Sequence, residues 1–188
     1  MTDFNTYTLE NAPDKARDVL ETVNKAYGFV PNMLGTMAEA PTLVEAYLAA
    51  GKALAKSSLS DVEQQVVFLT ISRANGCEYC VSAHSTIAGM HEVPQDAVEA
   101  IRDDRPIDDA RLEAIRKLTI ALYDKRGWLS DDDIESFLGA GFERQQLLEV
   151  ILGVGMKTWS NYVNHIAGTE LDEAFRKTAW KAPKNRVA

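Results

Sequence analysis

Two cysteines and one histidine, Cys77, Cys80 and His84, lie within one short stretch and have the types and spacing for redox chemistry. The chain holds only two cysteines in 188 residues, so chance would place them three apart roughly one time in a hundred. At about 100° per residue, all three side chains fall within about 60° of one helix face. The N–H groups and dipole of a helix start favour a thiolate, and the imidazole one turn below can take or hold a proton. The pattern therefore predicts a redox-active dithiol site.

Other interpretations of the pair remain open. Two cysteines and one histidine also form a zinc ligand set, so a Cys2His structural module is one alternative, although no second ligand pair follows and the other histidines are His91 and His165. A second alternative is a scaffold in which both thiols pack as small apolar groups and are merely redox-sensitive. Haem attachment is excluded because Val81 follows Cys80. No glycine-rich dinucleotide motif is present, so we expect no cofactor.

Helix signals on both sides of the cysteines identify the elements that must position them. Ser60 followed by Glu63 fits a capping box, and Asn75-Gly76 fits a helix end, which predicts a helix over residues 61–74. That helix is apolar almost all round, so we expect it at the centre of the core or in a subunit interface. A second helix starts at or just before Cys77 and runs to about Met90. The dithiol is thus predicted at a helix N-terminus.

The rest of the chain also shows helical spacing, and no strand pair or hairpin signal stands out. The predicted fold is therefore all-α, a compact single domain over residues 1–188 with its core motif at about 59–90 and a mobile basic tail at 181–188. Proline starts, glycine ends and apolar periodicity predict further helices at 13–28, from residue 31, and at 41–54, 94–103, 110–126, 130–138 and 143–166.

Composition limits the partners and the compartment. The hydrophobic fraction of 46% and the charged fraction of 26% are those of a soluble globular protein. A net charge of -8 has the wrong sign for binding nucleic acid or anionic lipid, so neither is expected as a partner. The sequence shows no signal peptide and no apolar run of about 20 residues, from which we expect a cytoplasmic location.

The stretch from Asn75 to His84, preceded by Leu59-Ser60 and an apolar helix, resembles the core motif of the alkylhydroperoxidase D and carboxymuconolactone decarboxylase superfamily, in its peroxidase-related branch. Residues 28–32 and 161–172 are similar to the same branch. The resemblance implies an AhpD-like helical fold, a homotrimer or homohexamer, and a thiol cycle that reduces a hydroperoxide with electrons from a protein or small thiol.

The resemblance also implies roles for the residues of the motif. Cys80 would be the peroxidatic thiol, Cys77 its partner, and His84 would assist deprotonation or orient the peroxide. The decarboxylase branch does not depend on a cysteine pair, so the motif argues against lactone decarboxylation. The predicted function is a thiol-dependent hydroperoxide reductase with peroxiredoxin activity.

One position departs from the family pattern. The family's proton-relay glutamate lies twelve residues before the first cysteine, and here that position is Gln65, which cannot shuttle a proton. Glu63 is the nearest acid, but the capping box accounts for it without catalysis. We keep Gln65 and Glu63 as the candidate relay positions. The departure leaves a disulfide oxidoreductase as the alternative activity.

Overall fold

The computed structural model describes residues 4–183, and within that range the chain is helical and contains no strand. The predicted all-α fold is confirmed, and each predicted helix end lies within two residues of an observed one. Of the predicted basic tail, residues 184–188 lie outside the described residues. The helices are α1 (Asp14–Tyr27), α2 (Asn32–Met37), α3 (Pro41–Leu54), α4 (Asp61–Ala74), α5 (Glu78–Met90), α6 (Gln95–Arg102), α7 (Ala110–Asp124), α8 (Asp131–Gly139) and α9 (Arg144–Ala167), followed by a 3-10 helix, η1 (Glu173–Thr178).

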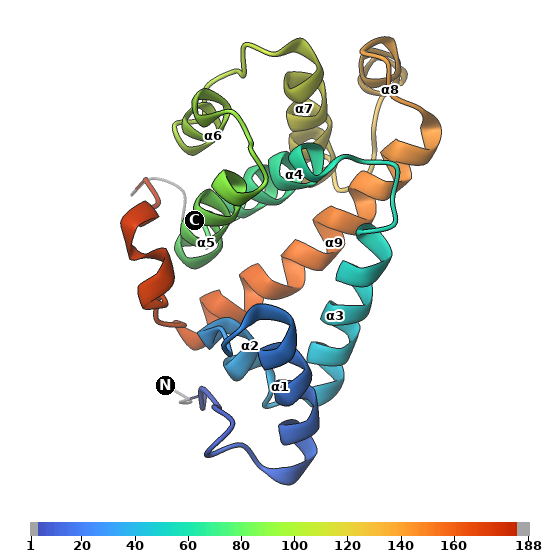
Figure 1. The fold of residues 1–188 in the computed structure, drawn as a ribbon. Helices are drawn as coiled ribbons and strands as arrows, with labels where there is room; N and C mark the ends of the chain where they lie inside the picture. The colour runs from blue at the N-terminus through green and yellow to red at the C-terminus, as the bar shows by residue number, and fades with distance from the viewer. Residues whose placement is uncertain (1–3, 184–188) are drawn as a thin grey trace.

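Helix α4 lies at the centre of the molecule and packs against α5, α6, α7 and α9 (Figure 1). It begins with the predicted capping box, in which Ser60 Oγ accepts from the Glu63 N–H at 3.2 Å and Glu63 Oε2 accepts from the Ser60 N–H at 2.8 Å. Its apolar side chains are buried on every side because other helices surround it. The least exposed of them, each at most 1%, are Val66, Val67, Leu69 and Ile71.

Two groups of buried apolar side chains form the core, and α9 joins them. One group lies around α1, α2, α3 and the start of α5, and the other around α4, α6, α7 and α8. The long helix α9 runs diagonally between them and contacts α2, α3, α4, α5 and α7 (Figure 1). Helices α4, α5 and α9 therefore meet where the two groups adjoin, and the cysteines lie at that junction.

The link between α4 and α5 fixes the position of the dithiol. Gly76 adopts a left-handed conformation with φ +69°, which the lack of a Cβ makes favourable, and the Cys77 N–H then donates to Ser72 O at 2.9 Å. The chain turns and α5 begins at once, with Cys77 as its N-cap. Cys80 consequently lies in the first turn of α5, and the predicted helix N-terminus is confirmed.

The segment after α9 returns over α5. Helix η1, which the sequence pattern did not predict, places Thr178 where its hydroxyl donates to Ser82 O at 2.8 Å. Arg102 Nη1 donates to Thr178 O at 2.9 Å, and the Trp180 N–H donates to Ser82 Oγ at 3.0 Å. Further on, Lys181 pairs with Glu78 at 2.7 Å. The C-terminal segment is thus held against the outer side of the dithiol helix.

None of the helices within residues 4–183 combines the length and the apolar character that crossing a bilayer requires.

Candidate active site around Cys80

The two thiols are both buried and free, but they differ in what they face. Cys77 and Cys80 are each 1% exposed, and His84 is 8% exposed. Cys80 and His84 line a cavity of about 400 Å³, whereas Cys77 is not among its lining residues. The structure therefore brings the three predicted residues together on α5, with Cys80 facing the cavity and Cys77 behind it.

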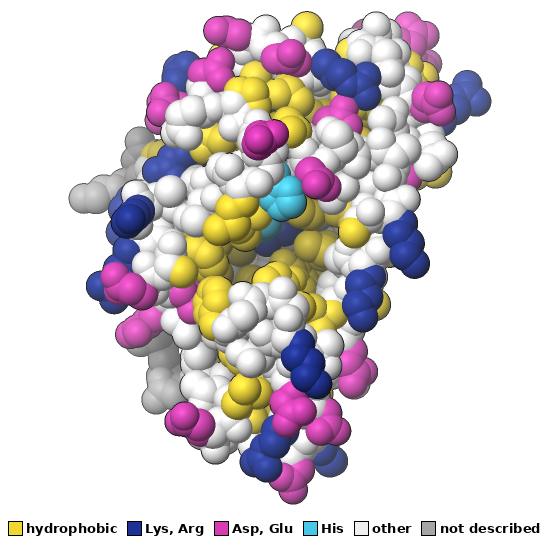
Figure 2. Space-filling model, viewed as in Figure 1, with side chains coloured by type: hydrophobic (Ala, Val, Ile, Leu, Met, Phe, Trp, Pro, Cys, Tyr) yellow, Lys and Arg dark blue, Asp and Glu magenta, His cyan; other side chains and the backbone are white. Residues whose placement is uncertain are grey.

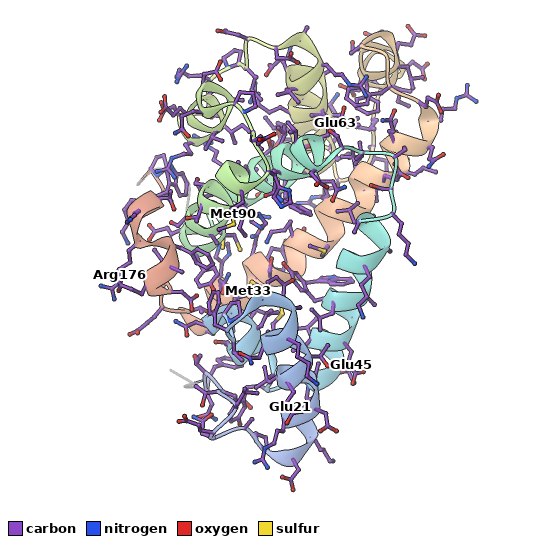
Figure 3. All side chains as sticks on the ribbon, in the orientation of Figure 1. Glu21, Met33, Glu45, Glu63, Met90 and Arg176 are labelled. Atoms are coloured by element: carbon purple, nitrogen blue, oxygen red, sulfur yellow. The ribbon has the colours of Figure 1, made fainter. Side chains whose placement is uncertain are left out.

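The cavity lies between α2, α3, α4, α5 and α9 and is mainly apolar. Figure 2 shows a hollow in the surface that is edged by hydrophobic side chains, with a basic side chain inside it and a histidine at its edge. Met33 from α2 and Met90 from the end of α5, both labelled in Figure 3, are among the residues that line the cavity. The other large apolar lining residues are Tyr27, Phe29, Leu34, Tyr47, Leu54, Phe68, Tyr79, Ile87, Met156 and Phe175.

Helix α9 supplies a set of polar side chains around the thiols that the sequence analysis did not identify. Lys157, which is 1% exposed, has its Nζ 3.8 Å from Cys80 Sγ. Asn164 Nδ2 donates to Cys80 Sγ at 3.3 Å and lies 3.7 Å from Cys77 Sγ, and Ser160 Oγ is 3.8 Å from Cys80 Sγ. A signal existed, because the polar residues of this helix at positions 157, 160, 161 and 164 follow helical spacing and mark one buried polar stripe.

These contacts set the charge of the dithiol. Burial raises the pKa of Cys80, but a hydrogen bond from Cys77, the positive charge of Lys157 and a hydrogen bond from Ser160 lower it, to about 5. The hydrogen bond to Cys80, together with burial, raises the pKa of Cys77. Burial lowers the pKa of Lys157, but the negative charge of the neighbouring Cys80 thiolate opposes this effect, and the pKa ends above its ordinary value. The reduced site thus holds a Cys80 thiolate, a Lys157 ammonium and a neutral Cys77 thiol.

His84 is neutral and has its orientation fixed by Gln65. Burial, then the charges of Lys157 and His91, lower the pKa of His84 well below its ordinary value. Its Nδ1 lies 2.9 Å from Gln65 Oε1, and its ring packs on Phe68 with centroids 5.1 Å apart. Since an amide oxygen only accepts, Nδ1 carries the proton and Nε2 offers a lone pair. His84 can therefore accept a hydrogen bond but has no second proton to give.

The two candidate relay positions are separated in the structure. Gln65 lines the cavity and contacts His84, whereas Glu63 does not line the cavity and lies at the first turn of α4 (Figure 3). Glu63 caps its own helix and pairs with Arg111 at 2.7 Å. His165 is exposed near the end of α9 and is not part of the cavity, while the third histidine, His91, lines it.

In the part of the chain that the structure describes, no three His, Cys, Asp or Glu side chains are grouped as the ligands of a metal ion would be. Residues 4–183 therefore contain no preformed ligand set for the zinc ion of a Cys2His module.

Tyr79, between the two cysteines, ties the cavity wall to two distant segments. Its hydroxyl donates to Asp172, and the same carboxylate accepts from the Asn32 N–H at 3.1 Å. Burial, followed by the hydrogen bond to Asp172, raises the pKa of Tyr79. Phe175 packs edge-on against the tyrosine ring at 6.2 Å. The segments that contain Asn32 and Asp172 therefore meet at Tyr79, beside the dithiol.

Comparison with known proteins agrees with this architecture. Residues 41–120 match the model of the carboxymuconolactone decarboxylase family, a region that runs from α3 into α7 and includes the dithiol. No curated protein sequence matches the chain.

Several solved structures share the fold. A peroxidase-related protein of Ralstonia eutropha JMP134 with an alkylhydroperoxidase AhpD core is 24% identical, with a TM-score of 0.78 over 92% of this chain and 93% of the other. A peroxidase-related protein of Silicibacter sp. TM1040 is 20% identical, with a TM-score of 0.77 over 93% and 92%. A cysteine-to-alanine variant of the debrominase Bmp8, in complex with 2,3,4-tribromopyrrole, is 20% identical, with a TM-score of 0.78 over 95% and 96%. The chain is thus similar to the carboxymuconolactone decarboxylase family over residues 41–120, and it shares its helical fold with these solved structures.

Proposed function

We propose that the chain is a cytoplasmic thiol-dependent hydroperoxide reductase that cycles Cys77 and Cys80 between dithiol and disulfide. The observation that carries the proposal is a thiolate on the wall of an apolar cavity, Cys80, with a neutral thiol directly behind it, Cys77. A thiolate is the nucleophile that peroxide chemistry requires, and a neighbouring thiol is what converts its oxidised form to a disulfide.

Each group has a place in the reaction. The Cys80 thiolate attacks the terminal oxygen of the hydroperoxide, the O–O bond breaks, and Cys80 becomes a sulfenic acid while an alkoxide leaves and takes up a proton to give an alcohol. Cys77 then condenses with the sulfenic acid, so that an S–S bond forms and water leaves. His84 Nε2 accepts a hydrogen bond from the O–H of the bound hydroperoxide and orients it, and Gln65 keeps the ring in that tautomer. No step requires a bound cofactor.

The alternative activity is that of a disulfide oxidoreductase with another substrate. Two observations favour this activity over that of a peroxidase with a broad substrate range. Position 65 is a glutamine, which cannot relay a proton, and Cys80 lies in a cavity. The debrominase of similar fold adds a third class of substrate, a small halogenated ring, for which a cavity of about 400 Å³ has room.

The test is hydroperoxide consumption with a dithiol reductant. We expect consumption by the wild type, none by Cys80→Ser, and a single turnover by Cys77→Ser that leaves a sulfenic acid trapped by dimedone. Ser57→Ala, which lies away from the cavity, is the matched control. The mechanism is wrong if Cys80→Ser consumes hydroperoxide as fast as the wild type. A disulfide substrate and 2,3,4-tribromopyrrole assayed in parallel distinguish the alternatives, and elemental analysis detects a zinc module.

The proposal includes a homotrimer or homohexamer, supported by an apolar stripe along the outer face of α9. Apolar side chains exposed at helical spacing on one face are typical of a protein interface. In analytical ultracentrifugation, we expect the wild type to have the mass of three or six chains and Ile166→Asp to have a lower mass. A monomeric wild type would contradict the proposed oligomer. The stripe, with exposed fractions, consists of Leu148 (64%), Ile151 (45%), Trp159 (40%), Tyr162 (53%) and Ile166 (69%).

A further inference from the structure

Lys157 is a buried lysine whose nearest counter-charge is a thiolate. Its Nζ lies 3.8 Å from Cys80 Sγ and 5.9 Å from the ring centres of Tyr47 and Phe68. The groups that favour its charge are Cys80, Tyr47 and Cys77, and none of them is a carboxylate. A buried ammonium without a counter-charge is costly, so Lys157 and the Cys80 thiolate stabilise each other.

Two other polar groups beside Cys80, those of His84 and Tyr79, hold their protons in hydrogen bonds that point away from the reacting sulfur. The single ring proton of His84 is held by Gln65. The Tyr79 hydroxyl donates to Asp172. Lys157 differs because it carries three protons on an Nζ that lines the cavity next to the reacting sulfur.

We infer that Lys157 is the acid–base partner of Cys80: its ammonium holds Cys80 as the thiolate, and it protonates the alkoxide that leaves the hydroperoxide. The second part rests on the function proposed above. The sulfur attacks the terminal oxygen, an S–O bond forms as the O–O bond breaks, and the sulfur is oxidised by two electrons. The alkoxide leaves with the O–O bonding pair and takes one Nζ proton, which gives an alcohol, a Cys80 sulfenic acid and a neutral Lys157 amine.

The remaining steps return the proton. Cys77 condenses with the sulfenic acid, and its S–H proton leaves with the hydroxyl as water, so the disulfide form has no thiolate beside Lys157. A dithiol reductant then reduces the disulfide and is itself oxidised to a disulfide. Of its two protons, one restores the Cys77 thiol and the other recharges Lys157. The lysine therefore takes over the proton transfer that a glutamine at position 65 cannot perform.

Two substitutions separate the charge of Lys157 from its proton. Lys157→Met removes both, and Lys157→Arg keeps the charge on a guanidinium that does not deprotonate. All variants are made in a Cys77→Ser background, which leaves Cys80 as the only thiol. The first measurement is the rate of alkylation by iodoacetamide against pH. We expect the background protein to have a midpoint below the ordinary thiol value of about 8.5, Lys157→Arg to change it little, and Lys157→Met to raise it by at least one pH unit.

The second measurement compares two peroxides at a pH where Cys80 is fully ionised. tert-Butyl hydroperoxide releases a strongly basic alkoxide that needs a proton, whereas peroxybenzoic acid releases a carboxylate that does not. We expect Lys157→Arg to lose about 100-fold in the rate with tert-butyl hydroperoxide, as is typical for the loss of a general acid, and less than about threefold with peroxybenzoic acid.

The outcomes discriminate among the claims. An unchanged alkylation midpoint in a folded Lys157→Met protein overturns the thiolate–lysine pair, and equal losses with the two peroxides in Lys157→Arg overturn the proton transfer. If Lys157→Met fails to fold, the peroxide comparison in Lys157→Arg decides the inference alone. A last outcome separates the inference from the proposed function. If the wild type reduces neither peroxide, the proposed function and the proton transfer to an alkoxide are both overturned. If the alkylation midpoint still rises in Lys157→Met, the thiolate–lysine pair stands.

Discussion

Replacing Gln65 by glutamate places a carboxylate where the structure has an amide oxygen, 2.9 Å from His84 Nδ1. In the wild type, burial together with the charges of Lys157 and His91 keeps the pKa of His84 low, so its ring stays neutral. A carboxylate centred about 4 Å from the imidazolium attracts it by about 4 kcal/mol at an effective dielectric constant of about 20. That energy corresponds to a roughly thousandfold higher proton affinity of the ring.

The expected result is that Gln65→Glu raises the pKa of His84 above that in the wild type, so that the ring binds a proton at a higher pH. The assay is an NMR titration of the histidine ring carbons, with each of the three signals assigned through a single substitution. Gln64→Glu is the matched control, because it also adds a carboxylate at the cavity but from a side chain that bonds to Leu59 O instead of His84. We expect its His84 signal to titrate much as in the wild type.

The titration has a functional counterpart. If His84 gains a proton in Gln65→Glu, it can deliver that proton to an alkoxide, so the double variant Gln65→Glu, Lys157→Arg should reduce tert-butyl hydroperoxide at least tenfold faster than Lys157→Arg alone. The reasoning is refuted if the His84 signal in Gln65→Glu moves by less than one pH unit, or if Gln64→Glu moves it equally. In either case the contact between Gln65 and the ring would not control its proton.

Three further results are expected. Tyr79→Phe removes the hydroxyl bonded to Asp172 and should lower the unfolding free energy in urea by about 2 kcal/mol, and an unchanged midpoint would contradict this contact. Because folding lowers the pKa of Cys80 from an ordinary value of about 8.5 to about 5, the unfolded chain binds more protons between these pH values. The reduced protein should therefore gain stability from about pH 5 to 8.5 and lose this contribution as the pH falls through about 5. In pH-dependent denaturation, Cys80→Ser should lose the slope between about pH 6.5 and 8.5, and the slope that the lowered pKa of His84 causes below about 6.5 should remain. Gly35→Ala would push a Cβ against the backbone oxygen of Tyr7, whose N–H donates to Gly35 O at 3.1 Å, and should lower the free energy of unfolding by about 1–3 kcal/mol. The measurement is the melting temperature, and an unchanged value would show that the N-terminal segment moves aside at little cost.

The parts of the fold that could be predicted from the sequence are those with local causes. The ends of α4 depend on Ser60 and Glu63 at one terminus and on Gly76 at the other, and each signal acts within a few residues. The same holds for the start of α5, which brings Cys80 into a first helical turn. The side-chain spacing also placed Cys80 and His84 on one face, and both line the cavity.

The rest of the fold and of the site depends on which helices pack together, and local sequence signals do not determine this. Lys157 lies 77 positions after Cys80 and was not identified, because a lysine in a helix is ordinarily exposed and only its polar neighbours on one buried face mark it as unusual. Likewise, the capping role of Glu63 was predicted, but its ion pair with Arg111 follows from the packing of α4 against α7. The returning segment η1 is held largely by bonds from Arg102 and by Thr178, without an apolar period of its own.

The distance along the chain between the dithiol and Lys157 has a consequence for biosynthesis. A ribosome adding about 5–20 residues per second makes Cys80 roughly 4–15 seconds before it makes Lys157. During that interval the two cysteines are ordinary thiols, mostly protonated at neutral pH and slow to react with oxidants. Cys80 becomes a strong nucleophile only when α9 docks against α5 and brings Lys157 to it. The reactivity of Cys80 is thereby tied to the docking of a helix that is synthesised late.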